Sequence, residues 1–246
     1  MAERNAPTYG EPNWEMVGRW LHLPPEEDGP FWALNLMKYR EAAAYEDGSD
    51  RGMSGREADD AYAPLGPLAA IGATVAFHGD VTDQTLGEPA WDRVGIVRYP
   101  TRAAFFAMQQ RDDFKDQHVH KEAGMAFTIV MACHPETHDD VDAGGAMVLT
   151  VEPSGADPLV VPDGVVPVVT YTVEGVIVGD DRAFSRARFD RVPPDTLAAL
   201  TAATPEGSQQ VVVDIGVDRL VDSIVAPGAH LKLQKRVPGA AGRPSR

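Results

Sequence analysis

Alternating apolar and polar positions predict several strands in the first half of the chain. The stretch FWALNLMKYR, residues 31–40, places Trp32 and Leu34 on one strand face and Asn35 on the other. We expect further strands in ATVAFHGDV, WDRVGIVRY and FTIVMACHP. Helical spacing and cap residues predict helices in DDAYAPLGPLAAIGA, RAAFFAMQQRDDF and QHVHKEAGM. The predicted order is therefore strand, helix, strand, strand, helix, strand.

The second half repeats much of this order after the polar linker ETHDDVDAGG. We expect strands in AMVLTVEP, VVPVVTYTVEGVIVG and AFSRARFDRVP, then the helix PDTLAALTAA and a closing strand near DRLVDSIVA. AFSRARFDRVP occupies the place that AWDRVGIVRYP holds in the first half, which predicts an internal repeat. The connection SGADPLVVPDG looks too short and Pro-rich for a crossover helix, so the second copy is expected to be abbreviated.

This pattern predicts an α+β protein of two tandem ferredoxin-like (βαββαβ) units. Such a unit covers one sheet face with helices, so we expect the two bare faces to pack sheet to sheet as a dimeric α+β barrel. The expected parts are a helical leader at 1–30, the first unit at 31–136, the second unit at 146–236 and a disordered tail at 237–246.

Composition and charge narrow the partners of the protein. The 246 residues are 43% hydrophobic and 24% charged, as in soluble globular proteins. A net charge of −15 argues against nucleic acid, which needs a basic surface to bind. Cys133 is the sole cysteine, which excludes an internal disulfide and favours a core thiol in a reducing compartment. Without a signal-like or membrane-spanning apolar stretch, a cytoplasmic protein with no membrane partner is expected.

Residues 31–134 resemble the bacterial domain-of-unknown-function 1330 family, of the dimeric α+β barrel superfamily. The similarity is carried by NLMKY at 35–39, WDRVGIVRYPTRAAFFAM at 91–108 and HVHKEAG at 118–124. The resemblance implies paired sheets and a pocket either between the sheets or between a sheet and its helices, and it carries no established reaction. It leaves open whether the chain is a monomeric pseudo-dimer or forms a homodimer.

Polar side chains on the expected inward strand positions are the candidate catalytic groups. Asn35 could orient a substrate oxygen, and His78 could take or give a proton near neutral pH. Aligning the two halves places Glu174 at the position of His78 and Thr150 at that of Asn35. Each of these groups has a structural alternative, because buried polar side chains are usually satisfied within the core.

The helix around HVHKE offers two more histidines. Residues two apart on a helix point in different directions, so only one of His118 and His120 is expected to face inward. This spacing argues against a metal site, as does the loop composition around His134 and His138, and we expect no metal.

Candidate substrate-binding groups lie at the end of the first strand and in the leader. Lys38 could reach solvent or an anionic substrate group, beside Tyr39. Trp14 in the leader could instead be a packing group that covers a barrel mouth.

The preferred hypothesis is an enzyme without cofactor that acts on a small molecule. It would be a lyase, isomerase or cyclase that moves protons on a carbonyl or aromatic substrate, with His78, Asn35 and one of His118 and His120 in the site. The sequence has no Walker loop, dinucleotide fingerprint or Gly-x-Ser-x-Gly elbow. The alternatives are a haem-dependent or cofactor-free oxygenase and a non-catalytic ligand-binding barrel.

Overall fold

The computed structural model describes residues 7–139 and 143–225, so the predicted tail at 237–246 lies outside the described residues. The strands are β1 (Glu11–Pro12), β2 (Phe31–Tyr39), β3 (Thr74–Leu86), β4 (Arg93–Tyr99), β5 (Met125–His138), β6 (Ala146–Pro153), β7 (Val166–Gly179), β8 (Phe184–Val192) and β9 (Gln209–Asp218). The helices are α1 (Trp14–Leu21), α2 (Gly55–Ala61), α3 (Leu65–Ala70), α4 (Arg102–Gln110), α5 (Asp112–Gly124), α6 (Leu197–Ala203) and α7 (Leu220–Val225).

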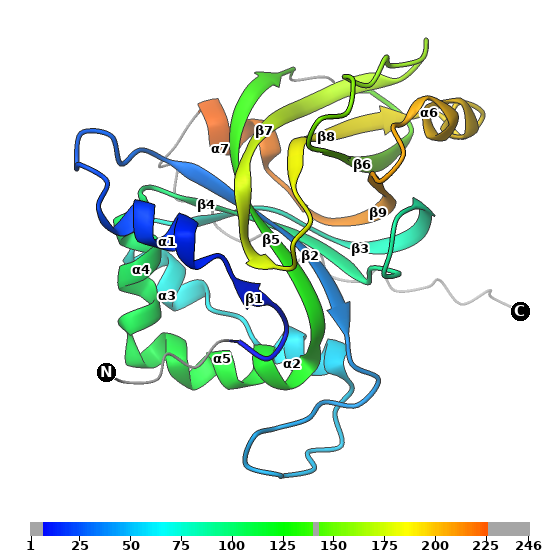
Figure 1. Cartoon of the computed structure of the whole chain (residues 1–246). Coiled ribbons are helices and arrows are strands. Elements are labelled where there is room, and N and C mark those ends of the chain that lie inside the picture. The colour runs from blue at the N-terminus through cyan, green and yellow to red at the C-terminus, as the bar shows by residue number, and fades with distance from the viewer. Residues whose placement is uncertain (1–6, 140–142, 226–246) are drawn as a thin grey trace, which may run out of the picture.

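Eight of these strands form one closed antiparallel β-barrel. Their order is β7-β5-β2-β4-β3-β9-β6-β8, and β8 pairs back onto β7 to complete the circle (Figure 1). The short strand β1 pairs with the last two residues of β7, beyond the end of its pairing with β8. Each half of the chain contributes four neighbouring strands to the barrel.

The prediction of two tandem ferredoxin-like units packed sheet to sheet as a dimeric α+β barrel is wrong. Strands of the two halves pair directly, β3 with β9 and β5 with β7, so the halves share one continuous sheet. An open sheet leaves unpaired N–H and C=O groups along its edges, and this pairing removes those edges. The connection at 154–165 contains no helix, so the second half is not a second ferredoxin-like unit and the tandem repeat is not supported.

The closing strand also lies earlier than predicted. β9 is formed by QQVVVDIGVD, and the stretch near DRLVDSIVA forms α7 instead. The Asp218 carboxylate accepts a hydrogen bond from the N–H of Leu220 at the start of this helix. Leu220 is fully buried with the barrel core, and Trp32 donates to the hydroxyl of Ser223 at 2.8 Å. The helix α7 is thereby fixed against the barrel.

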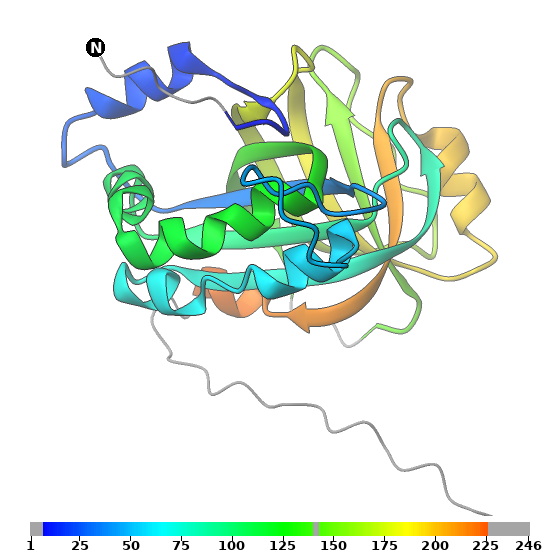
Figure 2. The same cartoon turned by 90° about the horizontal axis from the view of Figure 1, so that it is seen from below.

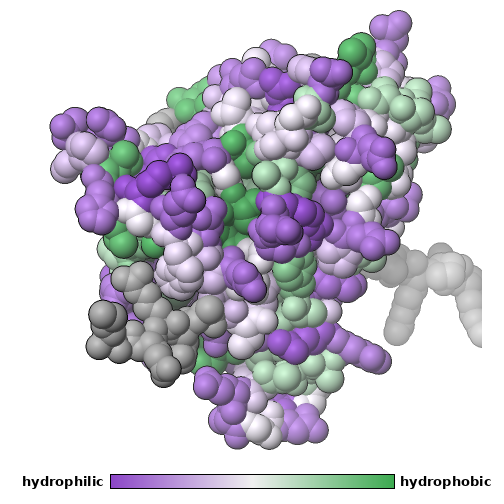
Figure 3. Space-filling view, viewed as in Figure 1, coloured by the Kyte–Doolittle hydropathy of each residue, from purple (hydrophilic) through white to green (hydrophobic). Residues whose placement is uncertain are grey.

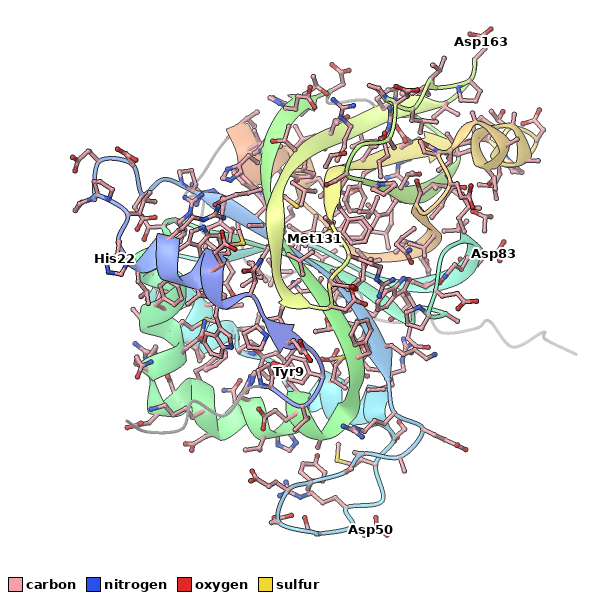
Figure 4. The ribbon with its side chains drawn as sticks, viewed as in Figure 1. Tyr9, His22, Asp50, Asp83, Met131 and Asp163 are labelled. Carbon is pink, nitrogen blue, oxygen red and sulfur yellow. The ribbon has the colours of Figure 1, made fainter. Side chains whose placement is uncertain are left out.

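Apolar side chains fill the interior of the barrel. Leu34, Phe77 and Phe189 are completely buried there, and the Phe77 and Phe189 ring centroids lie 4.9 Å apart. Cys133 is also buried in this core, where burial raises its pKa, so the expectation of a core thiol is confirmed. Met131, from the middle of β5, lies at the centre of the molecule in Figure 4. The interior is thus a packed core.

A layer of helices covers the outer face of the first four strands (Figure 2). A second apolar cluster lies beneath it, where Trp20, Phe31, Leu68 and Phe114 are buried. The helix predicted around DDAYAPLGPLAAIGA is divided into α2 and α3, with Pro64 preceding α3. The second half carries only α6 in its connections between strands.

The barrel core contains one polar atom whose removal gives a test of this packing. The Tyr171 hydroxyl is buried and has no hydrogen-bond partner in the described part of the chain. Tyr171→Phe is therefore expected to raise the free energy of unfolding by about 1 kcal/mol, because a buried unpaired donor is removed. Urea-induced unfolding at neutral pH measures this change.

The matched control is Tyr39→Phe, because the Tyr39 hydroxyl donates to Asp59 at 2.6 Å. This variant is expected to lose about 1–2 kcal/mol. A loss of more than 1 kcal/mol in Tyr171→Phe would show that its hydroxyl has a partner, contrary to this structure.

Candidate functional site

Asn35 and His78 lie in one row across three neighbouring strands, on the outer face of the barrel. Gly95 of β4 pairs with Asn35 of β2 on one side and with His78 of β3 on the other. Their neighbours along β2, Leu34 and Leu36, point into the core, so Asn35 points outward. Gly95 has no side chain, and the terminal methyl of Met37 lies over it, 3.2 Å from where a Cβ would stand.

Both side chains have unused hydrogen-bonding capacity. The Asn35 amide nitrogen donates to the carbonyl of Ala33 at 3.0 Å, and its amide oxygen has no partner among the described residues. His78 makes no hydrogen bond to the described residues, and burial together with Arg93 lowers the pKa of its imidazole. Both side chains are only half-buried although helices cover this side of the barrel, so solvent-sized space reaches them. The pair can therefore contact a small molecule.

The helix α5 directs a stripe of three side chains toward the sheet. Phe114, His118 and Lys121 are spaced four and three residues apart, which aligns them on one helix face. The His118 ring stacks on Phe114 at 5.0 Å between centroids. Its Nε2 lies 3.2 Å from the Tyr9 hydroxyl, and its Nδ1 is buried without a partner. Burial and nearby Lys121 lower the pKa of His118 to about 4, so the imidazole is neutral at physiological pH.

Lys121 is held between two aromatic rings. Its Nζ lies 5.8 Å from the ring centroid of Tyr9 and 5.5 Å from that of Tyr62. Figure 4 shows Tyr9 just before β1 and beside α5. Lys121 forms no ion pair within residues 7–139 and 143–225. Burial lowers the pKa of its ammonium, and the carboxylate of Asp59 opposes that effect.

A buried arginine fixes α2 above the sheet. Arg93 of β4 is 4% exposed and donates to Asp59 at 2.9 Å, to Asp60 at 2.7 Å and to Asp80 at 2.9 Å. Tyr39 donates to the same Asp59 carboxylate. A buried charge needs close partners, and this network provides them from α2 and β3. It also holds the chain that leads from α2 to Tyr62.

An open pocket of about 400 Å³ lies at the end of β2. Lys38 and Tyr39, the predicted substrate-binding residues, both line it. The Lys38 ammonium lies 3.1 Å from the Asp92 carboxylate, so an internal partner already offsets part of its charge. The pocket is lined by Lys38, Tyr39, Arg40, Glu41, Ser54, Arg56 and Asp92.

The two predicted helix histidines separate as their spacing indicates. His118 faces the sheet, whereas His120 contacts the 41–57 segment, with its Nδ1 2.8 Å from the Tyr45 hydroxyl. Trp14 is 48% exposed on α1 and does not line the row of Asn35 and His78. Figure 3 shows that hydrophilic side chains cover most of the face viewed there, interrupted by smaller hydrophobic areas.

Glu174 and Thr150 do not join His78 and Asn35. Three strands, β5, β2 and β4, lie between the β7 strand of Glu174 and the β3 strand of His78. Glu174 instead accepts hydrogen bonds from Trp20 and Arg102, each at 2.6 Å. Thr150 accepts one from Gln210 at 3.0 Å. Both residues therefore bond to other side chains of the protein, as in the structural alternative given for them above.

Sequence reasoning missed Lys121, Tyr62, Asp59 and Arg93. The i, i+3 spacing of His118 and Lys121 was a readable signal for their shared face. Because α5 has no continuous apolar stripe, its sequence pattern did not indicate which face is buried. Asp59 and Arg93 become partners only through the packing of α2 on β4, which no local pattern reveals.

The described residues contain no group of three or more His, Cys, Asp or Glu side chains that could hold a metal ion. Within residues 7–139 and 143–225, no helix has the length and apolar character needed to cross a bilayer.

The fold and this site define a closed antiparallel β-barrel with polar groups enclosed under an external helical layer. No family model and no curated protein matches the chain. The crystal structure of methylated RPA0582 protein is 26% identical and covers 53% of this chain and 97% of that one, with a TM-score of 0.47. A structure of RPA0582, a protein of unknown function from Rhodopseudomonas palustris, is 26% identical and covers 52% and 98%, with a TM-score of 0.45. Neither description names an activity, so the lyase and isomerase classes gain no support.

The Glu174 cluster supplies a test of stability against pH. Burial alone would raise the pKa of Glu174, but hydrogen bonds from His134, Trp20 and Arg102 lower it from 4.5 to about 2. Glu174→Gln is expected to lower the free energy of unfolding at pH 7 by about 1–3 kcal/mol. Because the folded pKa is the lower one, this stabilisation is present above about pH 4.5 and is lost as the pH falls toward 2.

Urea unfolding of parent and variant across this pH range measures the difference. Glu136→Gln is the matched control, since Glu136 is exposed and lies 3.3 Å from Arg186. It is expected to cost less than about 0.5 kcal/mol. A Glu174→Gln difference that does not change with pH would contradict the assigned hydrogen bonds.

Proposed function

We propose that the protein is an acid–base enzyme that moves a proton on a small carbonyl or aromatic substrate. The observation that carries the proposal is the row of Asn35, Gly95 and His78, in which two half-buried polar groups with unused hydrogen-bonding capacity flank a residue without a side chain. A buried polar group left unpaired costs free energy unless a ligand or water satisfies it. The row is therefore suited to binding a polar small molecule.

The two groups have complementary roles in this proposal. The lowered pKa leaves His78 neutral at pH 7, so its imidazole can accept a proton from carbon. The Asn35 amide nitrogen retains a second N–H, which can donate to the oxygen where negative charge develops. Two strand spacings separate the residues, or about 9–10 Å, which suits a substrate of a few bonds in length.

Two further features define the setting of the reaction. The second proton-handling group is the neutral imidazole of His118, which lies on α5 in the helical layer outside the barrel. The single cysteine suits a reducing compartment, so we place the enzyme in the cytoplasm. A ligand-binding barrel without catalysis and a haem-dependent oxygenase are the rivals.

Proton exchange at carbon tests this proposal without knowledge of the natural product. The parent protein is expected to accelerate hydrogen–deuterium exchange beside the carbonyl for at least one member of a panel of aldehydes and ketones in D₂O. His78→Ala is expected to reduce that rate by about 10²–10⁴-fold, because general-base catalysis is lost. Asn35→Ala should reduce it by about 10²-fold or more, through loss of the oxygen donor. Proton NMR follows the exchange.

The matched control is His22→Ala, since His22 is exposed at the end of α1 and its imidazole bonds to the carbonyl of Gly18 in the same helix. This variant should exchange at the parent rate. Compounds that bind but never exchange would favour the ligand-binding barrel, and a Soret band in the purified protein would favour the haem enzyme. Exchange that persists unchanged in His78→Ala removes His78 from the mechanism.

The pH profile gives a second test of the same residue. The neutral form of His78 is the active base, so the exchange rate falls when the imidazole is protonated. Because the pKa of His78 is lowered from 6.5, this fall occurs below pH 6.5, and the rate at pH 6.5 should exceed half of its plateau value. A midpoint at or above pH 6.5 would contradict the assignment.

A further inference from the structure

Lys121 has features that the proton-transfer proposal does not use. Its ammonium lies between the rings of Tyr9 and Tyr62, and no carboxylate pairs with it in the described chain. A partly buried cation without an ion pair is unfavourable unless the group loses its proton or gains a ligand. Cation–π contacts of this length offset only part of that cost.

We propose that Lys121 is a nucleophilic amine that forms an imine with the aldehyde or ketone group of the substrate. The inference deepens the proposed function, on which the carbonyl class of the substrate rests. Two observations support this inference. The amine lies between aromatic rings without an ion pair in the described chain, and it is one helical turn from His118, whose Nδ1 has no partner there. Burial also favours the neutral amine that such a reaction requires.

The surrounding charges favour a neutral carbonyl group over an anion at this amine. Burial raises the pKa of Tyr62, and the carboxylate of Asp59 adds to that rise and also acts on Lys121, so its negative field reaches this enclosure. An anionic ligand would be repelled by that field. A neutral aldehyde or ketone is not, and aromatic rings at Tyr9, Tyr62 and Phe114 suit an apolar substituent.

The reaction balances without an oxidant or reductant. The Lys121 lone pair forms a bond to the carbonyl carbon, and the π electrons of the C=O bond move to oxygen. One proton passes from nitrogen to that oxygen to give a carbinolamine, for which His118 is the neighbouring proton carrier. The C–O bond then breaks as the hydroxyl takes a proton from solvent through His118 and leaves as water, which gives a protonated imine that keeps the second N–H. The protonated imine withdraws electrons from the adjacent carbon and so acidifies it.

Reductive trapping of the imine tests the proposal in the full-length protein. Benzaldehyde is the probe and sodium cyanoborohydride the reductant, at pH 7, with labelled peptides identified by mass spectrometry. Lys115 is the internal comparison, because it lies on the same helix, is 55% exposed and pairs with Asp112. Lys121 is expected to be labelled faster than Lys115, because burial lowers the pKa of its ammonium and so raises the fraction of neutral amine.

Lys121→Arg should abolish the fast label, whereas Lys115→Arg should leave it unchanged. Circular dichroism and thermal unfolding check that both variants fold. Equal labelling of the two lysines, or absence of label at Lys121 in the folded parent protein, would overturn the proposal.

His78→Ala separates the two proposals. It is expected to retain rapid labelling of Lys121 while losing carbon proton exchange. Labelling at Lys121 with exchange that is independent of His78 would support the amine and refute the proposed base. If Lys121 is not labelled in the parent, and exchange depends on His78 but continues in Lys121→Arg, the base is supported and the amine is refuted.

Discussion

Closure of the barrel is the constraint on which the remaining structure depends. Pairing β3 with β9, β5 with β7, and β7 with β8 leaves the eight strands without an open edge in the ring. An open edge would expose unpaired backbone groups to solvent or to other chains. Closure also encloses one face of every strand, and large side chains such as Phe77, Phe189 and Tyr171 fill the enclosed space. Polar groups with room around them are consequently found on the outer face.

The helical layer makes the two halves of that outer face chemically different. On the first half, α2 places Asp59 over Arg93 and α5 places His118 beside Tyr9, and both helices restrict water around these groups. On the second half α6 packs near β6 and β9, and Gln210 bonds to Thr150, Thr85, Thr201 and Thr204. That network has partners for its polar groups, whereas the Asn35 amide oxygen and the His78 imidazole have none among the described residues. The row that contains Asn35 and His78 lies in the first half.

Local order could be predicted from the sequence, but the pairing between distant strands could not. Alternation correctly located β2 and β4, whereas the spacing of His118 and His120 predicted that only one of them faces inward and did not tell which. Strand periodicity is the same in two packed sheets and in one closed barrel, so it could not distinguish them. No strand was predicted at β9, whose ends are polar, and the apolar residues of α7 were predicted to form a strand. Lys121 escaped notice because its role depends on Tyr9 and Tyr62, which reach it from distant parts of the chain.

The electrostatics of the helical layer favour neutral forms of its titratable groups. Burial lowers the pKa values of His78, His118 and Lys121, and it raises those of Tyr9 and Tyr62. Each of these shifts disfavours the charged form of its group, because burial restricts hydration of the charge. The Arg93 network is the exception, because its charge is matched by carboxylates at hydrogen-bond distance. For the proposed reaction, a layer that disfavours charge on His78, His118 and Lys121 favours the forms in which an imidazole accepts a proton and an amine attacks a carbonyl carbon.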